Sequence, residues 1–211
     1  IFLDEEVEKD ISSHMIEFYL EFLDNLRQSK HLEEYFQIKE QDKKIDSLNS
    51  EKAVPSLMVK EAYSQSAKRK LKNLGLDKKF VVLNTGGSWK TKRWPENYFA
   101  EIADLLAEKG FKILFVGGPS DTERVSYILE KIENEDMVYN LSGKTSLLEL
   151  AAVLKRAELV VSGDTGPVHI AAAVGTDTVT IFGPSDEEKY APRGRAKNIL
   201  IKDVDLSCRP C

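Results

Sequence analysis

The stretch Val161–Ala173, with the sequence VSGDTGPVHIAAA, predicts a strand, a short loop and a helix in direct succession. Pro167 stands in the first turn of the expected helix, where proline is tolerated. The free backbone N–H groups at a helix start, together with the helix dipole, favour an anion, typically a phosphate. Asp164, Thr165 and His169 add an acceptor, a hydroxyl and an imidazole beside that position. We therefore expect a phosphate-binding loop here.

On both sides of this stretch, from Lys78 onward, short apolar strands alternate with helical patterns. Such alternation is typical of an α/β fold with a doubly wound parallel sheet. Ligands of these sheets bind at the carboxyl ends of the strands. The loops 84–95, 117–120 and 162–167 all follow expected strands, so we expect them to meet at one edge of the sheet. The expected strands are 80–83, 112–116, 137–139, 159–161, 178–182 and 198–201.

Helices are expected between these strands and before them. A basic helix over 58–74 ends at Gly75, a natural stop. Capping-box patterns predict helix starts at Ser120–Glu123 and Ser146–Glu149. Further helices are expected over 150–154 and 167–174, and Pro95 opens another, whose core face consists of Phe99, Ile102, Leu105 and Leu106.

Length and charge exclude several classes of protein. The chain has 211 residues, 42% of them apolar, and a formal net charge of −5, which argues against general nucleic-acid binding. No apolar run approaches the roughly 18–20 residues that cross a bilayer. Ile1–Leu3 is followed at once by acidic residues, unlike a signal peptide. Because there is no initiator Met and both ends are abrupt, we expect a piece of a longer protein.

Other binding motifs are incomplete. No Gly-x-Gly-x-x-Gly follows the first strand, and Val138 occupies the position that a P-loop ending at Gly143–Thr145 would give to glycine. Both observations argue against a nicotinamide dehydrogenase or an NTPase. Cys208 and Cys211 form a Cys-x-x-Cys pair. Two ligands do not complete a zinc site, so we expect reduced thiols and no metal.

The motifs resemble those of one enzyme family. Asp164–Ala173, with Phe182–Ser185 shortly after, resembles the ADP-heptose:lipopolysaccharide heptosyltransferases of glycosyltransferase family 9. Residues 84–95, NTGGSWKTKRWP, are similar to the first loop of that family, and Cys208–Cys211 is similar to a Cys-x-Pro-Cys segment of many members. The resemblance is clear from about Lys78 to Cys211.

The resemblance implies a set of site residues. In the family, the equivalents of Thr165, Gly166 and the next amide hold the diphosphate of the nucleotide sugar, and the equivalent of Asp164 reaches the sugar. A hydroxyl and a lysine of the first loop also contact the diphosphate, which here indicates Ser88 and Lys92, with Lys92 stabilising the leaving group. The full expected set is Ser88, Lys92, Gly118, Lys144, Thr145, Asp164, Thr165, Gly166, Pro167 and His169.

Each of these roles has an alternative. Asp164 and Thr165 are also good helix caps, His169 also fits a buried side chain that ties the loop to the core, and the charge of Lys92 also fits plain solvation. Lys90 and Arg93 compete for the role of Lys92. Gly87 stands where the family often has a second hydroxyl, and Pro119 where some members carry a Glu. Residues 141–145, which line the adenine pocket in the family, also fit a capped turn.

The resemblance also implies the domain organisation and the reaction. Residues 1–27 are expected to form the last helix of an N-terminal domain, 28–57 an interdomain connection, and 58–211 the Rossmann-like, nucleotide-sugar-binding C-terminal domain of a GT-B glycosyltransferase. The implied activity is inverting transfer of heptose from ADP-heptose to the lipopolysaccharide inner core, without metal or cofactor. The base is an Asp of the N-terminal domain, outside this chain.

The implied location is the cytoplasm, peripheral to the inner membrane, with no nucleic-acid partner. Two other functions stay open at this point: a GT-B transferase that uses a UDP- or GDP-sugar, and a non-catalytic nucleotide-sugar-binding module.

Overall fold

The computed structural model describes residues 55–76, 79–87, 89 and 92–201. The chain divides into two compact units, residues 1–53 and 54–211, and all described residues belong to the second unit. The helix expected within 1–27, most of the connection 28–57, and residues Ser88, Lys90, Cys208 and Cys211 lie outside the described residues.

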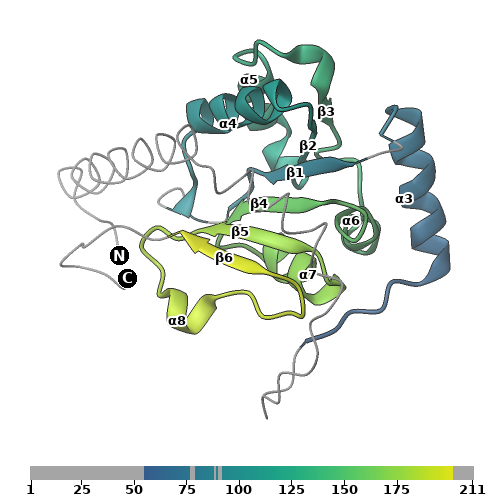
Figure 1. Cartoon of the computed structure of the whole chain (residues 1–211), viewed down its shortest axis with the longest axis vertical. Helices are drawn as coiled ribbons and strands as arrows, with labels where there is room; N and C mark the ends of the chain where they lie inside the picture. Colours follow the sequence, from purple (N-terminus) through teal and green to yellow (C-terminus); the bar gives the residue numbers. More distant parts are fainter. Residues whose placement is uncertain (1–54, 77–78, 88, 90–91, 202–211) are drawn as a thin grey trace. The chain divides into compact units, whose positions relative to one another are not determined.

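The described unit is built on a six-stranded sheet in which every pair of neighbours is parallel (Figure 1). The predicted strands are confirmed, with ends shifted by at most two residues. They are β1 (Phe80–Asn84), β2 (Lys112–Val116), β3 (Val138–Asn140), β4 (Leu159–Gly163), β5 (Asp177–Ile181) and β6 (Asn198–Ile201), in the order β3-β2-β1-β4-β5-β6. This order is that of a Rossmann-type fold, so the predicted doubly wound α/β class is confirmed.

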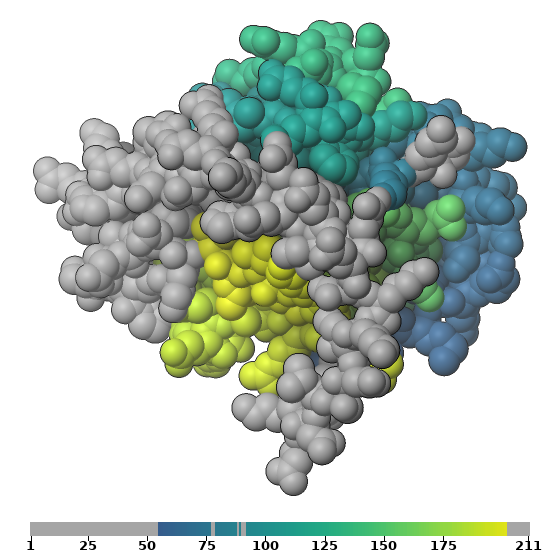
Figure 2. Space-filling model, viewed as in Figure 1, coloured from purple at the N-terminus to yellow at the C-terminus, as the bar shows by residue number. Residues whose placement is uncertain are grey.

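Helices cover both faces of the sheet (Figure 1). One face packs against α3 (Glu61–Asn73), α6 (Leu147–Leu154) and α7 (Gly166–Val174), whose apolar side chains form one core cluster with β1, β2 and β4. Since side chains alternate along a strand, the other residues of β1 face α4 (Glu96–Glu108) and α5 (Thr122–Leu129). In the space-filling view, α4 and α5 form the top of this unit and α3 its right-hand side (Figure 2).

Burial on two faces explains the apolar strands. All five residues of β1 are buried, as expected for a central parallel strand covered by helices on both sides. The indole ring of Trp94 packs edge-on against the Phe99 ring at 4.8 Å between centroids, and Trp94 is 1% exposed. Trp94 therefore anchors the start of α4, whose N-cap is Pro95.

Two local predictions at helix starts have different outcomes. The Ser146–Glu149 capping box is confirmed, since the Glu149 N–H donates to Ser146 and the Glu149 carboxylate accepts from the Ser146 N–H. The Ser120–Glu123 box is wrong. Pro119 opens a 3-10 turn, Pro119–Asp121, and the Asp121 carboxylate accepts from the Gly118 N–H at 2.8 Å, so α5 begins at Thr122.

Smaller differences concern side-chain burial and one short helix. Leu105, predicted on the core face of α4, is only half-buried, whereas Ala103 on the same helix is fully buried. The helix α8 (Glu187–Tyr190) was not expected from the sequence.

The strand order defines where a ligand can bind. β1 lies between β2 and β4, and the chain leaves β1 toward α4 on one face but leaves β4 toward α7 on the other. At such a switch point the two departing loops separate and leave a crevice beyond the carboxyl ends of the strands.

Candidate functional site

A cavity of about 840 Å³ occupies this crevice. Its walls come from the loops that follow β1, β2 and β4, from the turn before α6, and from the first turn of α7. The prediction that the three loops meet at one edge of the sheet is therefore confirmed. The volume is in the range of small-ligand and cofactor sites.

Most of the residues predicted for the site line this cavity. Ser88 lies outside the described residues. Lys144 does not line the cavity, since its ammonium donates to the Asn140 carbonyl at 3.1 Å. The predicted residues that line it are Lys92, Gly118, Thr145, Asp164, Thr165, Gly166, Pro167 and His169.

The start of α7 carries no side-chain cap. Thr165 is the N-cap residue, but its side chain makes no capping hydrogen bond. The carboxylate of Asp164 does not cap the helix either, so the simple-cap alternative is wrong. An ideal Cβ added to Gly166 would meet nothing within 4 Å, which leaves open space beside its backbone. Pro167 has no N–H, so the next amide after Gly166 is that of Val168.

Lys92 and Asp164, which both line the cavity, form an ion pair. The Lys92 ammonium lies 3.0 Å from the Asp164 carboxylate and 5.7 Å from the centre of the Tyr190 ring. Lys92 therefore faces the cavity and a charged partner, and plain solvation does not describe it. The side chain of Asp164 is 9% exposed, so water screens this pair weakly.

The surroundings of Asp164 favour its ionised form. Burial raises the pKa of the carboxyl, but contacts with His169, Lys92 and Ser185 outweigh that effect, and the pKa is about 2. The Nε2 atom of His169 lies 3.7 Å from the second carboxylate oxygen. Because the His169 side chain is 43% exposed, it does not tie the loop to the core as the buried alternative expected.

Arg124 of α5 holds the two ends of the loop that carries Lys92. Its guanidinium donates to the carbonyls of Thr85, where the loop begins, and Trp94, where it ends. It also forms an ion pair with Glu96 at 2.7 Å. Inside the loop, the Arg93 Nε donates to the Gly87 carbonyl at 2.7 Å, so Arg93 is partly committed to the loop itself.

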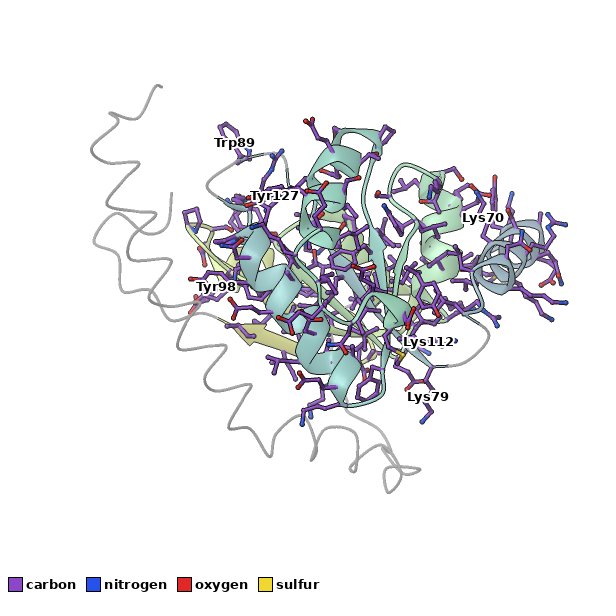
Figure 3. All side chains as sticks on the ribbon, turned by 90° about the horizontal axis from the view of Figure 1, so that it is seen from above. Lys70, Lys79, Trp89, Tyr98, Lys112 and Tyr127 are labelled. Atoms are coloured by element: carbon purple, nitrogen blue, oxygen red, sulfur yellow. The ribbon has the colours of Figure 1, made fainter. Side chains whose placement is uncertain are left out.

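Two glycines beside the cavity make room for a side chain of the protein. An ideal Cβ on Gly86 or on Gly117 would lie 2.8 Å from the Asp121 side chain. These glycines therefore make room for Asp121, which fixes the β2–α5 loop through Gly118. Trp89 projects outward from the β1–α4 loop at the cavity wall, and is 69% exposed (Figure 3).

Sequence reasoning missed other residues of this site. Asn84 is the last residue of β1, and its place before a loop at the sheet edge was an available signal. Ser185 lies in the Phe182–Ser185 motif but had no assigned role. Nothing local in the sequence indicates that Arg124 or Tyr190 approaches the site, because both depend on how α5 and α8 pack.

Residues 55–201, apart from the undescribed positions within that range, contain no group of His, Cys, Asp and Glu side chains that could hold a metal ion. In the same part of the chain, no helix is both long enough and apolar enough to span a membrane.

A model of glycosyltransferase family 9 (heptosyltransferase) matches residues 4–211. The chain belongs to glycosyltransferase family 9. It is 34% identical over 133 residues to lipopolysaccharide heptosyltransferase 1 of Pseudomonas aeruginosa and 31% identical over 136 residues to lipooligosaccharide heptosyltransferase 2 of Campylobacter jejuni. These matches cover 63% and 64% of this chain but only 36% and 42% of the relatives.

Solved structures of this family share the fold. A family 9 glycosyltransferase of Veillonella parvula superposes with a TM-score of 0.67 at 30% identity, covering 82% of this chain and 49% of the other. The E. coli heptosyltransferase WaaC with ADP gives a TM-score of 0.53 at 32% identity, covering 64% and 42%. This family 9 chain thus spans less than half the length of the proteins that it matches.

We expect Arg124→Gln to loosen the β1–α4 loop of this family 9 chain. Because the carbonyls of Thr85 and Trp94 lose a charged donor, the free energy of unfolding should fall by about 1–3 kcal/mol, measured by urea denaturation. Limited trypsin digestion should also cut after Lys92 and Arg93 faster. The exposed Arg156→Gln is the matched control, and equal behaviour of the two variants would contradict the clamp.

The ion pair of Asp164 predicts a pH dependence of stability. Because folding lowers the pKa of this carboxyl from 3.8 to about 2, its contribution is complete above about pH 4 and disappears as the pH falls through 2. Asp164→Asn should therefore show a shallower loss of unfolding free energy between pH 4 and 2 than the unmodified chain. Urea denaturation across this range measures it, with the exposed Asp136→Asn as control. Parallel curves for Asp164→Asn and the unmodified chain would show that the pair is not stabilising.

Proposed function

We propose that the full-length protein transfers heptose from ADP-heptose to the inner core of lipopolysaccharide, and that this chain is its donor-binding part. Relatives at 31–34% identity are named as lipopolysaccharide or lipooligosaccharide heptosyltransferases. E. coli heptosyltransferase WaaC has been solved with ADP and with ADP-2-deoxy-2-fluoro heptose. The observation that carries the proposal is the cavity that joins Lys92, the uncapped start of α7 and Asp164.

The diphosphate binds at the start of α7. The N–H group of Gly166 and the positive end of the helix dipole favour its negative charge. Lys92, whose ammonium lies 3.0 Å from the Asp164 carboxylate, adds a positive charge to the same cavity. Open space beside Gly166 allows a phosphate to approach the backbone closely.

The sugar lies against Asp164. An ionised carboxylate repels a diphosphate but accepts hydrogen bonds from hydroxyl groups. With a pKa of about 2, Asp164 is ionised at neutral pH. Because Asp164 contacts Lys92, the residue that binds the sugar lies beside the residue that binds the phosphate, close to the bond that breaks during transfer.

The reaction proceeds with inversion at the anomeric carbon. A base removes the proton of an acceptor hydroxyl, the oxygen attacks that carbon, and ADP leaves with the bonding electron pair. Lys92 and the start of α7 stabilise the charge that develops on the departing diphosphate. As the family resemblance implies, the base is an Asp of the N-terminal domain outside this chain, so we expect no turnover by this chain alone.

The acceptor sets the cellular location. Because inner-core lipopolysaccharide is anchored by lipid, the full-length protein meets it at the cytoplasmic surface of the inner membrane. A basic, exposed side of α3, with Lys68, Arg69 and Lys72, is compatible with an anionic surface.

Calorimetry on the isolated chain tests the proposed function. We expect ADP and ADP-heptose to bind, UDP and GDP to bind more weakly, and no heptose to be transferred to a lipopolysaccharide core acceptor. A preference for UDP would favour another nucleotide sugar as donor. Efficient transfer by this chain alone would show that the base lies within it.

Lys92→Ala should weaken ADP binding by about 1–3 kcal/mol, the range for a charge-assisted hydrogen bond. AMP, which has one phosphate fewer, should lose less. Lys144→Ala is the matched control, because that ammonium is held by Asn140 outside the cavity lining and should leave ADP binding unchanged. Equal losses for the two variants would remove Lys92 from its assigned role.

Asp164→Ala provides the complementary control for the Lys92 result. Removing this carboxylate frees the Lys92 ammonium, so ADP should bind as tightly as before or more tightly. ADP-heptose should bind more weakly because its sugar loses an acceptor. A parallel loss for both ligands would mean that Asp164 supports the loop and does not contact the sugar.

A further inference from the structure

Thr165 occupies a capping position without capping its helix. A threonine N-cap normally accepts a hydrogen bond from the second or third N–H of the helix. In α7 the second helical residue is Pro167, which has no N–H, and the N–H of the third, Val168, donates to the backbone carbonyl of Thr165 at 3.2 Å. The neighbouring helix α6 shows the ordinary arrangement, with Ser146 accepting from Glu149. The Thr165 side chain makes no such bond.

The Thr165 hydroxyl is instead held by the ends of β1 and β4. The Asn84 amide nitrogen donates to the Thr165 hydroxyl at 3.0 Å and to the Ser162 hydroxyl at 2.9 Å. The two hydroxyl oxygens lie 3.0 Å apart. Asn84 is 1% exposed and Ser162 fully buried, so water does not compete for these bonds. β1 and β4 are adjacent at the switch point of the sheet (Figure 1).

The hydroxyl protons have defined places in this network. Ser162 donates its own proton to the Gly163 carbonyl at 2.9 Å, so its oxygen acts as an acceptor toward Asn84. The Thr165 oxygen also accepts from Asn84. The proton of Thr165 is then available to Ser162 or to a group in the cavity, which Thr165 and Asn84 both line. Thr165 is thus prepared to donate a hydrogen bond.

We propose that Asn84 is a positioning residue that holds the Thr165 hydroxyl in the rotamer from which it donates to the diphosphate. Because the Asn84 amide supplies a hydrogen bond to the Thr165 oxygen, the Thr165 proton stays available to a ligand in the cavity. This inference rests on the proposed function of the site. Without Asn84, the Thr165 hydroxyl loses the donor that fixes its rotamer. The Asn84 amide oxygen has no hydrogen-bond partner among the residues that the structure describes, so Asn84 is fixed there through Ser162 and Thr165.

A double-mutant cycle on ADP affinity tests the proposal. We expect Asn84→Ala and Thr165→Val each to weaken ADP binding about tenfold, the loss of one hydrogen bond. The double variant should bind ADP no more weakly than Thr165→Val, since Asn84 acts on the ligand only through the Thr165 hydroxyl. Multiplied losses, about 100-fold in the double variant, would overturn the proposal. Thr178→Val is the matched control, because that buried hydroxyl donates to Asn198 between β5 and β6 and should leave affinity unchanged.

A second measurement needs no ligand. Three-bond NMR couplings report the χ1 rotamer of Thr165 in the free protein, and Asn84→Ala should change that rotamer whereas Thr178→Val should not. An unchanged rotamer would overturn the positioning role even if ADP affinity falls. If the unmodified chain fails to bind ADP while the rotamer shifts, the proposed function fails and the positioning role stands. Asn84→Ser carries the same expectations if Asn84→Ala does not fold.

Discussion

The divergence of the chain from β1 and β4 is the constraint on which the site depends. Parallel strands place all their carboxyl ends at one edge, and these neighbours send the chain to opposite faces. The crevice between the departing loops is therefore a consequence of strand order. Its depth is maintained by side chains that close the loops behind it, Arg124 under one loop and Asp121 under another. A rigid frame thus surrounds groups that are left open to a ligand.

Two side chains of opposite charge, Lys92 and Asp164, line the cavity together. The ammonium of Lys92 and the carboxylate of Asp164 hold each other in place at 3.0 Å. In the free protein the pair limits the cost of burying either charge alone. The nucleotide sugar proposed as ligand has a matching pair of surfaces, anionic phosphate and neutral hydroxyls. In that proposal Lys92 contacts the phosphate end and Asp164 the sugar end.

The sheet was predictable because its strands are continuous apolar runs, and the cavity wall was predictable because three polar loops follow such runs. Ser120–Glu123 has a capping pattern, but Pro119 starts a 3-10 turn before it. Lys92 and Lys144 are equivalent in type, and only packing assigns the first to the cavity. The role of Asn84 depends on strands that the chain separates widely, and its partner Thr165 lies 81 positions away. Such tertiary hydrogen bonds leave no local pattern.

The β1–α4 loop is attached to the domain through backbone atoms at its two ends. Arg124 donates to the backbone carbonyls of Thr85 and Trp94, so these hydrogen bonds do not depend on the side chains between the two residues. The segment between these two residues can consequently be exchanged while the rest of the domain keeps its structure. Its length and composition can change during evolution or by loop grafting while its end points keep their places, and donor preference can be redesigned there without repacking the domain.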